Sequence, residues 1–141
     1  MSCVFCDIIA GKIPSLRGYE DAHAVVFMDI AKDVDCNMVA VPKKHAESIL
    51  DCDGETLAQL MQAVKRVSEH CVHACGYEGV NLLNASGTAA GQSVPHFHIH
   101  IIPRGSGDGI DAWPTLPGAK RDIGEMFGRL RMKEESHGKA E

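Results

Sequence analysis

The chain has 141 residues, the size of one ordinary domain, and a formal net charge of −5 at pH 7. Its hydrophobic fraction of 45% and charged fraction of 23% are typical of a folded globular protein. The acidic balance argues against a nucleic-acid coat protein and against a polybasic membrane binder. A small anionic ligand stays compatible with it, because such a ligand needs only a local positive site.

The N-terminal residues, Met1 to Asp7, lack a basic segment followed by a long apolar run, so we expect no signal peptide. Nowhere does the sequence approach the roughly 20 consecutive apolar residues that a membrane span needs. We therefore expect a cytoplasmic protein. In that reducing compartment the six cysteines are expected to be thiols or metal ligands rather than disulfides.

The first half of the chain predicts three short strands and one long helix. The strands are Arg17–Glu20, Ala24–Asp29 and Asn37–Pro42, the first two joined as a hairpin. The helix runs from about Gly54 to Ala74, with Asp53 as N-cap and Gly76 as stop signal. Its apolar residues recur at steps of three and four and predict one buried face: Leu57, Leu60, Met61, Val64, Val67 and Cys71.

The second half predicts two further strands, Val80–Asn84 and His96–Pro103, separated by a loop of small residues. A shorter helix is expected over about 122–131, starting near Asp122, followed by a polar tail after Met132. Five short strands with one long helix between the third and the fourth predict a single antiparallel α+β domain over 1–141, with its core over about 3–113.

Three histidines, His96, His98 and His100, alternate with apolar residues in the last predicted strand. A strand has a period of two, so the imidazoles should share one face and the apolar residues should pack on the long helix. The imidazole face would then meet solvent or a ligand. Because polar strand faces normally carry Thr, Lys or Glu, three histidines there require an explanation.

The triad by itself permits three interpretations. Two histidines at positions i and i+2 can bind one zinc ion. All three are not expected to bind the same ion, because the Cα atoms of the outer two are about 13 Å apart in an extended strand. Alternatively, one histidine is a nucleophile and a neighbour orients it, since neutral imidazole is nucleophilic near neutral pH. The third interpretation is a surface strand with solvated histidines.

The loop before the triad favours the nucleophile. Its small residues let backbone amides approach a ligand, and Asn84, Gln92 and Ser93 add side-chain donors suited to phosphate oxygens. Glycines alone are weak evidence, since most of them mark turns. A donor-rich loop that leads directly into a histidine strand is a more specific pattern.

With these residues identified, the sequence resembles the histidine-triad (HIT) family of nucleotide-binding proteins. His96 to Ile102 matches the motif His-φ-His-φ-His-φ-φ, in which φ is apolar. Flanking and upstream segments are also similar to bacterial members: Ala90 to Val94, Pro103-Arg104, Phe5 to Pro14, Phe27 to Ile30 and Val41 to His45. The resemblance runs from about Cys3 to Trp113 and implies a HIT-like fold with a five-stranded antiparallel sheet, one long helix and short terminal helices.

The resemblance implies a purine nucleoside phosphoramidase-like hydrolase. His98 would attack the α-phosphorus of an AMP- or GMP-type amide or ester, and water would resolve the covalent nucleotidyl-histidine. His100 would contact the phosphate and hold His98, and His96 completes the triad. The remaining residues implied to bind the nucleotide are Gly91, Gln92, Ser93 and Asn84 at the phosphate, Asp29 at the ribose, and Phe5, Ile8, Ile13, Phe27 and Ile30 at the base.

Cys3 and Cys6 form a possible metal half-site, which is weak evidence alone. In a subset of bacterial relatives this pair binds structural zinc with two histidines, here His45 and His96. The set of two sulfurs and two nitrogens is closed, so the zinc would be structural, and the chemistry would need no cofactor. The other possibility is two free thiols and an ordinary histidine.

Relatives of this length are typically homodimers, and neither nucleic acid nor membrane is an expected partner. Many relatives carry Gly-His where this chain has Cys36-Asn37, which puts proton transfer or rate in question. Trp113 either reaches the leaving group or packs on the surface. Three functions stay open: a hydrolase or transferase, including a dinucleoside-polyphosphate hydrolase; a nucleotide-binding regulatory protein with little turnover; and a zinc-dependent hydrolase.

Overall fold

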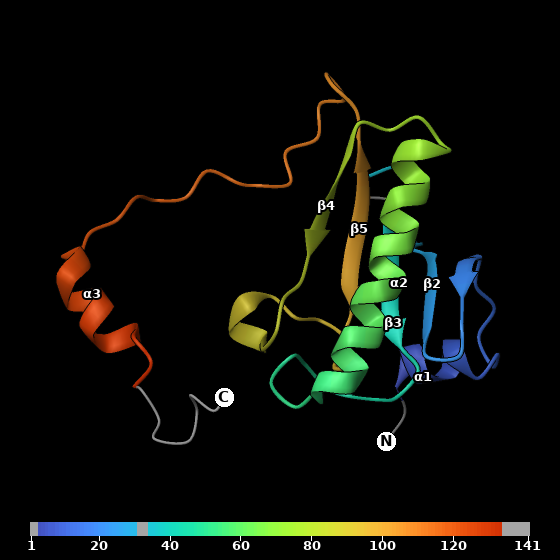
Figure 1. The fold of residues 1–141 in the computed structure, drawn as a ribbon, viewed down its shortest axis with the longest axis horizontal. Helices are drawn as coiled ribbons and strands as arrows, with labels where there is room; N and C mark the ends of the chain where they lie inside the picture. The colour runs from blue at the N-terminus through green and yellow to red at the C-terminus, as the bar shows by residue number, and fades with distance from the viewer. Residues whose placement is uncertain (1–2, 31–33, 134–141) are drawn as a thin grey trace.

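The computed structural model describes residues 3–30 and 34–133, which build one antiparallel sheet with helices on both faces (Figure 1). The strands follow the order β1-β2-β3-β5-β4 across the sheet. Their bounds are β1 (Arg17–Glu20), β2 (Ala24–Met28), β3 (Met38–Pro42), β4 (Gly79–Leu83) and β5 (Ile99–Arg104). This arrangement confirms the predicted five-stranded α+β fold, and places β5, which contains His100, the third histidine of the triad, between β3 and β4.

The central strands are buried on both faces. In β2 the side chains of Ala24 and Val26 belong to the core under the long helix α2, whereas Val25 and Phe27 belong to a second core under the short helix α1 (Val4–Ile9). Period two along the strand separates the two sets. A strand covered on both faces is apolar throughout, which explains the run from Ala24 to Phe27.

The long helix α2 (Gly54–His73) covers one face of the sheet. Asp53 caps it as predicted, with its Oδ1 accepting from the backbone N–H of Thr56 at 2.7 Å. Gly76 adopts φ +84° just after the helix, a left-handed conformation that favours glycine.

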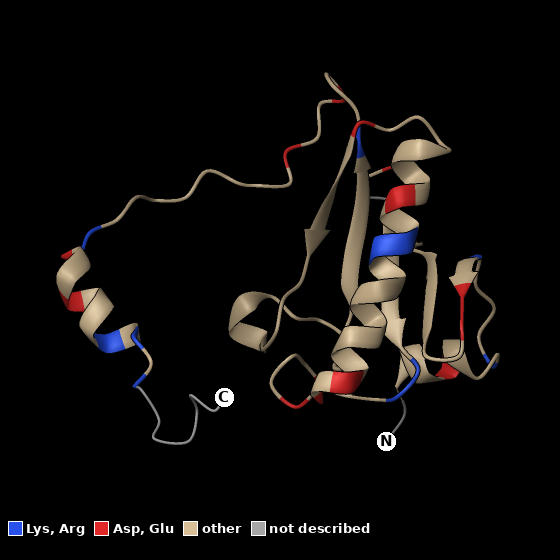
Figure 2. Cartoon of the chain, viewed as in Figure 1, with Lys and Arg blue, Asp and Glu red and all other residues tan. Residues whose placement is uncertain are grey.

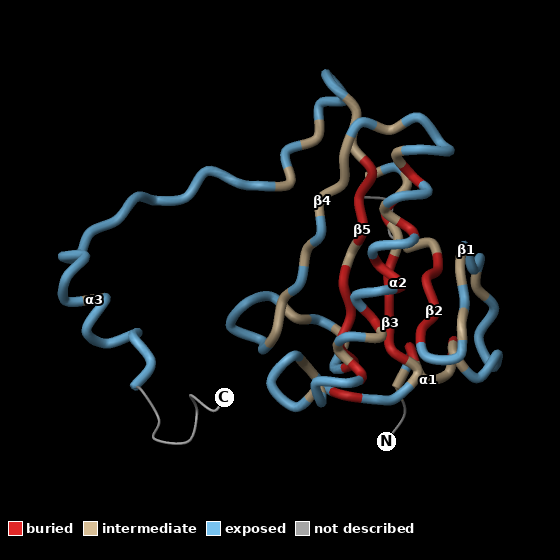
Figure 3. The backbone as a smooth tube through the Cα atoms, in the orientation of Figure 1, coloured by how far each residue is buried: buried red, intermediate tan, exposed pale blue. Residues whose placement is uncertain are grey.

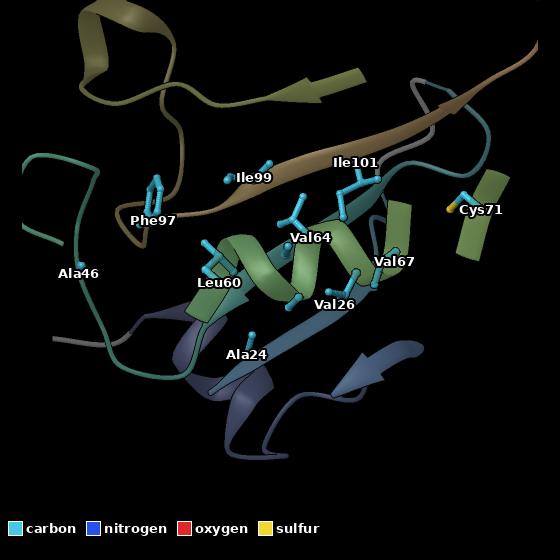
Figure 4. Packing of buried hydrophobic residues seen from close by; sticks show 12 residues of the cluster. Ala24, Val26, Ala46, Leu60, Val64, Val67, Cys71, Phe97, Ile99 and Ile101 are labelled. Atoms are coloured by element: carbon cyan, nitrogen blue, oxygen red, sulfur yellow. The ribbon is translucent and has the colours of Figure 1, made fainter. Parts of the chain in front are cut away.

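The buried face of α2 packs on the sheet through Leu60, Val64 and Val67 (Figure 4). Full burial of each such side chain stabilises the fold by about 1.5–3 kcal/mol. The predicted buried face is wrong at Met61, which is 38% exposed. Each residue advances 100° around the helix, so Met61 lies beyond the edge of the stripe and Ala63 fills the core instead.

The last strand begins later than predicted. It starts at Ile99 rather than His96 and ends at Arg104 rather than Pro103. The backbone N–H of Phe97 donates to the carbonyl of Ala46 at 2.7 Å instead of to a neighbouring strand, and pairing with β3 begins only at Ile99. The ends of β2, β3 and β4 differ from the prediction by one residue each, within the usual uncertainty of strand ends.

After the sheet, the chain continues as an extended arm over residues 111–133 that carries α3 (Ile123–Leu130) (Figure 1). Asp122 caps α3 as predicted, accepting from the N–H of Glu125 at 3.1 Å. No residue of α3 is buried, and the tube of the arm is exposed along almost its whole length (Figure 3). The part of the polar tail beyond residue 133 lies outside the described residues. No helix of residues 3–30 and 34–133 is long and apolar enough to cross a membrane.

Candidate functional site

The three histidines share one side of the chain but differ in burial. Phe97, Ile99 and Ile101 all lie in the core under α2, so the predicted alternation is confirmed although the strand is shorter. On the other side, under α1, His96 has no exposed surface, His98 is 7% exposed and the side chain of His100 is 31% exposed. The imidazole face therefore meets solvent only in part, because α1 covers its first residue.

Two contacts orient His98. Its Nδ1 lies 2.7 Å from the carbonyl oxygen of His96, and the ring of Phe5 packs edge-on at 5.1 Å between centroids. A carbonyl oxygen only accepts, so Nδ1 carries the proton and Nε2 keeps its lone pair. Asn84 fixes the main chain there, its Nδ2 donating to the carbonyl of His98 at 2.9 Å. A lone pair is thus available on Nε2 of His98.

His100 is the half-buried member of the triad. Its ring lies 5.2 Å from that of His98, and its Nδ1 lies 3.2 Å from Oδ1 of Asn37. Asn37, itself 7% exposed, donates through Nδ2 to Oδ2 of Asp29 at 3.2 Å. Burial lowers the pKa of His100, the neighbouring His98 lowers it further, and Asp29 opposes the shift. His100 is therefore neutral at neutral pH.

The loop before the triad is held by Gln92. Its Oε1 accepts from the N–H of Gly87 at 2.8 Å, and its Nε2 donates to the carbonyls of Glu47 and Val94 at 2.6 and 2.9 Å. Both N–H groups of the amide are thereby used within the protein. The sequence suggested a phosphate donor at this position, whereas in this structure Gln92 shapes the loop around the short 3₁₀ turn η1 (Thr88–Ala90).

The same loop exposes Ser93 and contains no charged residue from Asn84 to Pro95, as its uniform tan colour shows (Figure 2). Gly91 adopts φ +96°, in the left-handed region that favours glycine. Ser86 links the loop to its surroundings, since its Oγ accepts from the N–H of Ile49 and donates to Oδ1 of Asn84, both at 3.1 Å. Sequence reasoning missed the contacts of Ser86 with Ile49 and of Glu47 with Gln92, which join residues 37 and 45 positions apart.

The four implied metal ligands come together at the start of α1. The ligand atoms of Cys3, Cys6, His45 and His96 all lie within 4.8 Å of one another. His96 Nδ1 is 3.4 Å from Cys3 Sγ, 3.5 Å from Cys6 Sγ and 3.0 Å from His45 Nδ1, and Cys6 Sγ is 3.3 Å from His45 Nδ1. Desolvation, followed by the hydrogen bond to Cys3, raises the pKa of the Cys6 thiol to about 11. These residues form a possible Cys/His metal site.

His96 faces this cluster with its acceptor nitrogen. Its Nε2 lies 2.9 Å from the carbonyl oxygen of Pro42, so Nε2 carries the proton and Nδ1 presents a lone pair to the two thiols. Burial lowers the pKa of His96, although the contact with Pro42 opposes the shift. A neutral imidazole of this tautomer is the form that binds metal.

Of the residues implied for the base pocket, the structure brings only some together. Phe5, Ile8 and Phe27 belong to the core under α1, with the two phenyl rings 5.5 Å apart. Ile13 and Ile30 are 36% and 92% exposed. Asp29 and Ile30 instead border an open cleft of about 1090 Å³, lined as well by Leu16, Val34, Tyr77, Pro103 and residues of the segment 105–111. Trp113, on the arm, is 75% exposed.

Comparison with known proteins gives consistent matches. The sequence profile of the HIT domain family matches residues 10–107. The chain is 42% identical over 116 residues to the protein hit of Bacillus subtilis, covering 81% of this chain and 80% of that protein. It is 35% identical over 130 residues to the adenosine 5′-monophosphoramidase of Schizosaccharomyces pombe, covering 89% and 95%. The crystal structure of a zinc-bound histidine triad protein from Mycobacterium smegmatis superposes with a TM-score of 0.73 at 32% identity, covering 92% and 90%.

Proposed function

This chain belongs to the HIT domain family, and from that premise we propose that it cleaves nucleoside monophosphate amides or esters at the α-phosphorus through a covalent nucleotidyl-histidine at His98. The observation that carries the proposal is the contact between Nδ1 of His98 and the carbonyl of His96 at 2.7 Å. It leaves the lone pair on Nε2, the atom that must attack phosphorus.

The reaction has two displacements. In the first, Nε2 of His98 forms a bond to the α-phosphorus, and the bond to the amine or alcohol breaks as the leaving group takes a proton from solvent water. In the second, water attacks phosphorus, releases the nucleoside monophosphate with loss of a proton and returns the electron pair to Nε2. The His98 ring is cationic while bonded to phosphorus, and the carbonyl of His96 stabilises it through the Nδ1 proton.

The phosphate would lie between His98, His100 and the loop that Gln92 shapes. The hydroxyl of Ser93, the side chain of Asn84 and the backbone near Gly91 lie on that loop. Since the loop carries no charge, neutral dipoles there would stabilise the charge that develops on the nonbridging oxygens. Gln92 would act by holding the loop in place rather than by a direct contact.

The nucleoside would extend from the phosphate toward Asp29, whose carboxylate suits ribose hydroxyls. The base would pack on the core that contains Phe5, Ile8 and Phe27, with Ile13 and Ile30 at its exposed margin. A purine presents enough apolar surface for such a wall. The Schizosaccharomyces pombe relative is named for an AMP amide, which supports an adenosine phosphoramidate as the first probe.

We also propose that Cys3, Cys6, His45 and His96 bind one zinc ion. A tetrahedral ion with ordinary bond lengths would separate its two nitrogens by about 3.3 Å and a sulfur from a nitrogen by about 3.6 Å. The distances in this structure, 3.0 Å and 3.3–3.5 Å, fit that geometry. Bound zinc would be structural, because four protein ligands leave no position for substrate. The four residues would join α1 to the segment that carries His98.

A homodimer is proposed as well, because the outer strands β1 and β4 offer edges at which two sheets can join. Sedimentation at several concentrations measures it directly.

The proposed activity is tested with an adenosine phosphoramidate that releases a fluorescent amine. We expect turnover by the wild-type protein, turnover at least about 10³-fold lower in His98→Ala, and AMP binding by both. His23→Ala, at an exposed hairpin position outside the site, serves as matched control and should turn over normally.

Other outcomes contradict the proposal and favour an alternative. Wild-type protein that binds AMP but releases no amine would be a regulatory nucleotide-binding protein. Turnover that disappears with chelator, returns with metal and survives in His98→Ala would indicate a zinc-dependent hydrolase.

A further inference from the structure

Asn37 is buried beside the catalytic histidines although it precedes β3 by one residue. Its neighbour two residues on, Val39, pairs with His100 across the β3–β5 ladder. Val39 belongs to the core under α1, and the period of two places Asn37 on that same side. Its side chain therefore lies next to the His100 ring and only 7% of the residue is exposed.

The two ends of the Asn37 amide have different partners, and the partners decide its orientation. The carboxylate of Asp29 only accepts, so the amide nitrogen must face it, at 3.2 Å. The amide oxygen consequently faces Nδ1 of His100, also at 3.2 Å. Because that oxygen only accepts, Nδ1 of His100 must carry a proton. Asp29 does not make this contact itself, as its Oδ2 is 3.9 Å from the His100 nitrogen.

Resting on the function proposed above, we infer that Asn37 is a positioning residue that fixes His100 in the Nδ1–H tautomer, oriented through Asp29. The neutral His100 ring then presents a lone pair, not a proton, at Nε2. It can accept a hydrogen bond from the attacking water or from another acceptor molecule, and it does not donate to the phosphate oxygens. Asn37 touches neither the phosphate nor the reacting atoms in this account.

The amide performs this task in a way that imidazole does not. A histidine at position 37 could donate to His100 or accept from it, depending on its own tautomer, so the His100 proton would be free to occupy either nitrogen. An amide between a carboxylate and an imidazole has only one orientation that satisfies all three groups. Asn37 therefore specifies one tautomer of His100.

The first test is the tautomer itself, read from the ¹⁵N chemical shifts of the His100 ring in the resting protein. In the wild type we expect a protonated Nδ1 and an unprotonated Nε2 at pH 7.5. Asn37→Leu, which keeps the size of the side chain but removes its polar atoms, should populate the Nε2–H form. Asn37→Asp keeps an acceptor toward His100 and should restore the Nδ1–H form even if it packs less well against Asp29.

The second readout is kinetic, with the adenosine phosphoramidate. Asn37→Leu should lower kcat by about 10- to 100-fold, the range typical of losing a group that orients a functional histidine, while KM changes less than about threefold. Asn37→Asp should recover part of the lost kcat. Asn81→Asp is the matched control, because Oδ1 of Asn81 accepts from Arg104 at 2.6 Å and the aspartate keeps that acceptor.

Failure of this inference is distinguishable from failure of the proposed function. A wild-type protein without turnover contradicts the function and leaves the ¹⁵N measurement to test Asn37 alone. An unprotonated Nδ1 on His100 in the wild type overturns the inference, whatever the kinetics show. It is equally overturned if Asn37→Leu keeps the Nδ1–H signature with kcat within twofold of the wild type. If Asn37→Leu fails to fold, the ¹⁵N chemical shifts of the His100 ring in the wild type and in Asn37→Asp still test the inference.

Discussion

His96 and His98 are two residues apart and carry the same side chain, yet they have opposite tautomers. His96 donates from Nε2 to the carbonyl of Pro42 and turns Nδ1 toward two thiols, whereas His98 donates from Nδ1 to the carbonyl of His96 and keeps the lone pair on Nε2. In each case a backbone carbonyl selects the nitrogen that keeps its lone pair. The tautomer of each histidine here is therefore set by which of its ring nitrogens donates to a backbone carbonyl.

The same contact joins the two regions. The carbonyl that orients His98 belongs to His96, so the Cys/His cluster and the ring of the proposed nucleophile are one hydrogen bond apart. A substitution that disrupts the cluster should displace the His96 carbonyl and thereby the His98 ring. A substitution of His98 should leave the cluster intact.

The largest effect is expected from His96→Ala. The substitution removes a proposed metal ligand, opens a cavity at a residue without exposed surface and leaves the carbonyl of Pro42 without this donor. We expect the free energy of unfolding to fall by about 4 kcal/mol or more and the metal to be lost. Denaturant unfolding with zinc analysis measures both. His98→Ala should retain the metal, and equal losses in the two variants would contradict the asymmetry.

Cys6→Ser should have the next largest effect. Without this sulfur we expect the loss of about one zinc per chain. The free energy of unfolding should fall by about 3 kcal/mol, which lowers the melting temperature by roughly 10 °C. Turnover should fall only about 10-fold, because His98 remains and only the position of the His96 carbonyl that orients it becomes less well fixed. Elemental analysis and thermal unfolding check this. Cys75→Ser, at an exposed position, is the control; metal-free wild-type protein from a purification without chelator would refute the zinc proposal.

Gln92→Leu sharpens the comparison on the catalytic side alone. Three hydrogen bonds of the amide are removed from the loop, at distances of 2.6 to 2.9 Å. We expect kcat/KM for the phosphoramidate to fall about 10- to 100-fold, with the metal content unchanged. Each lost hydrogen bond is worth about 1 kcal/mol, and only part of that sum is lost from transition-state stabilisation. Thr88→Val, an exposed position of the same loop, should have little effect. A simultaneous loss of metal in Gln92→Leu would show that the two regions are not separable.

The smallest effect is a pH dependence at His100. Burial holds its pKa below the ordinary value, so the unfolded chain binds this proton more readily than the folded one. The stability contribution is therefore complete above a pH of about 6.5 and is lost as the pH falls below it. Between pH 7.5 and 5.5 the wild type should lose more unfolding free energy than His100→Gln. An equal loss in both would place the pH dependence elsewhere.

The sequence predicted elements whose causes are local. Asp53 and Asp122 are caps that signal helix starts within three residues, and alternation of Phe97, Ile99 and Ile101 indicated the strand face. The candidate metal ligands came from resemblance, and the structure brings all four together. Their convergence could not be derived from spacing, because His45 and His96 are 51 residues apart.

What the sequence did not predict depends on contacts between distant segments. Phe97 bonds to Ala46 rather than to a strand, which delays the start of β5. Gln92 has the composition of a ligand donor but uses its amide on Glu47, a residue 45 positions away. In the sequence, Asn37 was notable only because many related proteins have histidine at this position. Its contacts with Asp29 and His100 depend on the fold and could not be predicted from the sequence.

The central claim, a nucleophilic Nε2 on His98, is tested most directly by the stereochemistry at phosphorus. An adenosine phosphoramidothioate of one configuration is hydrolysed in ¹⁸O-labelled water, and the configuration of the labelled product is determined. Two in-line displacements through a nucleotidyl-histidine predict overall retention. Inversion would show a single direct attack by water and would contradict the role assigned to His98.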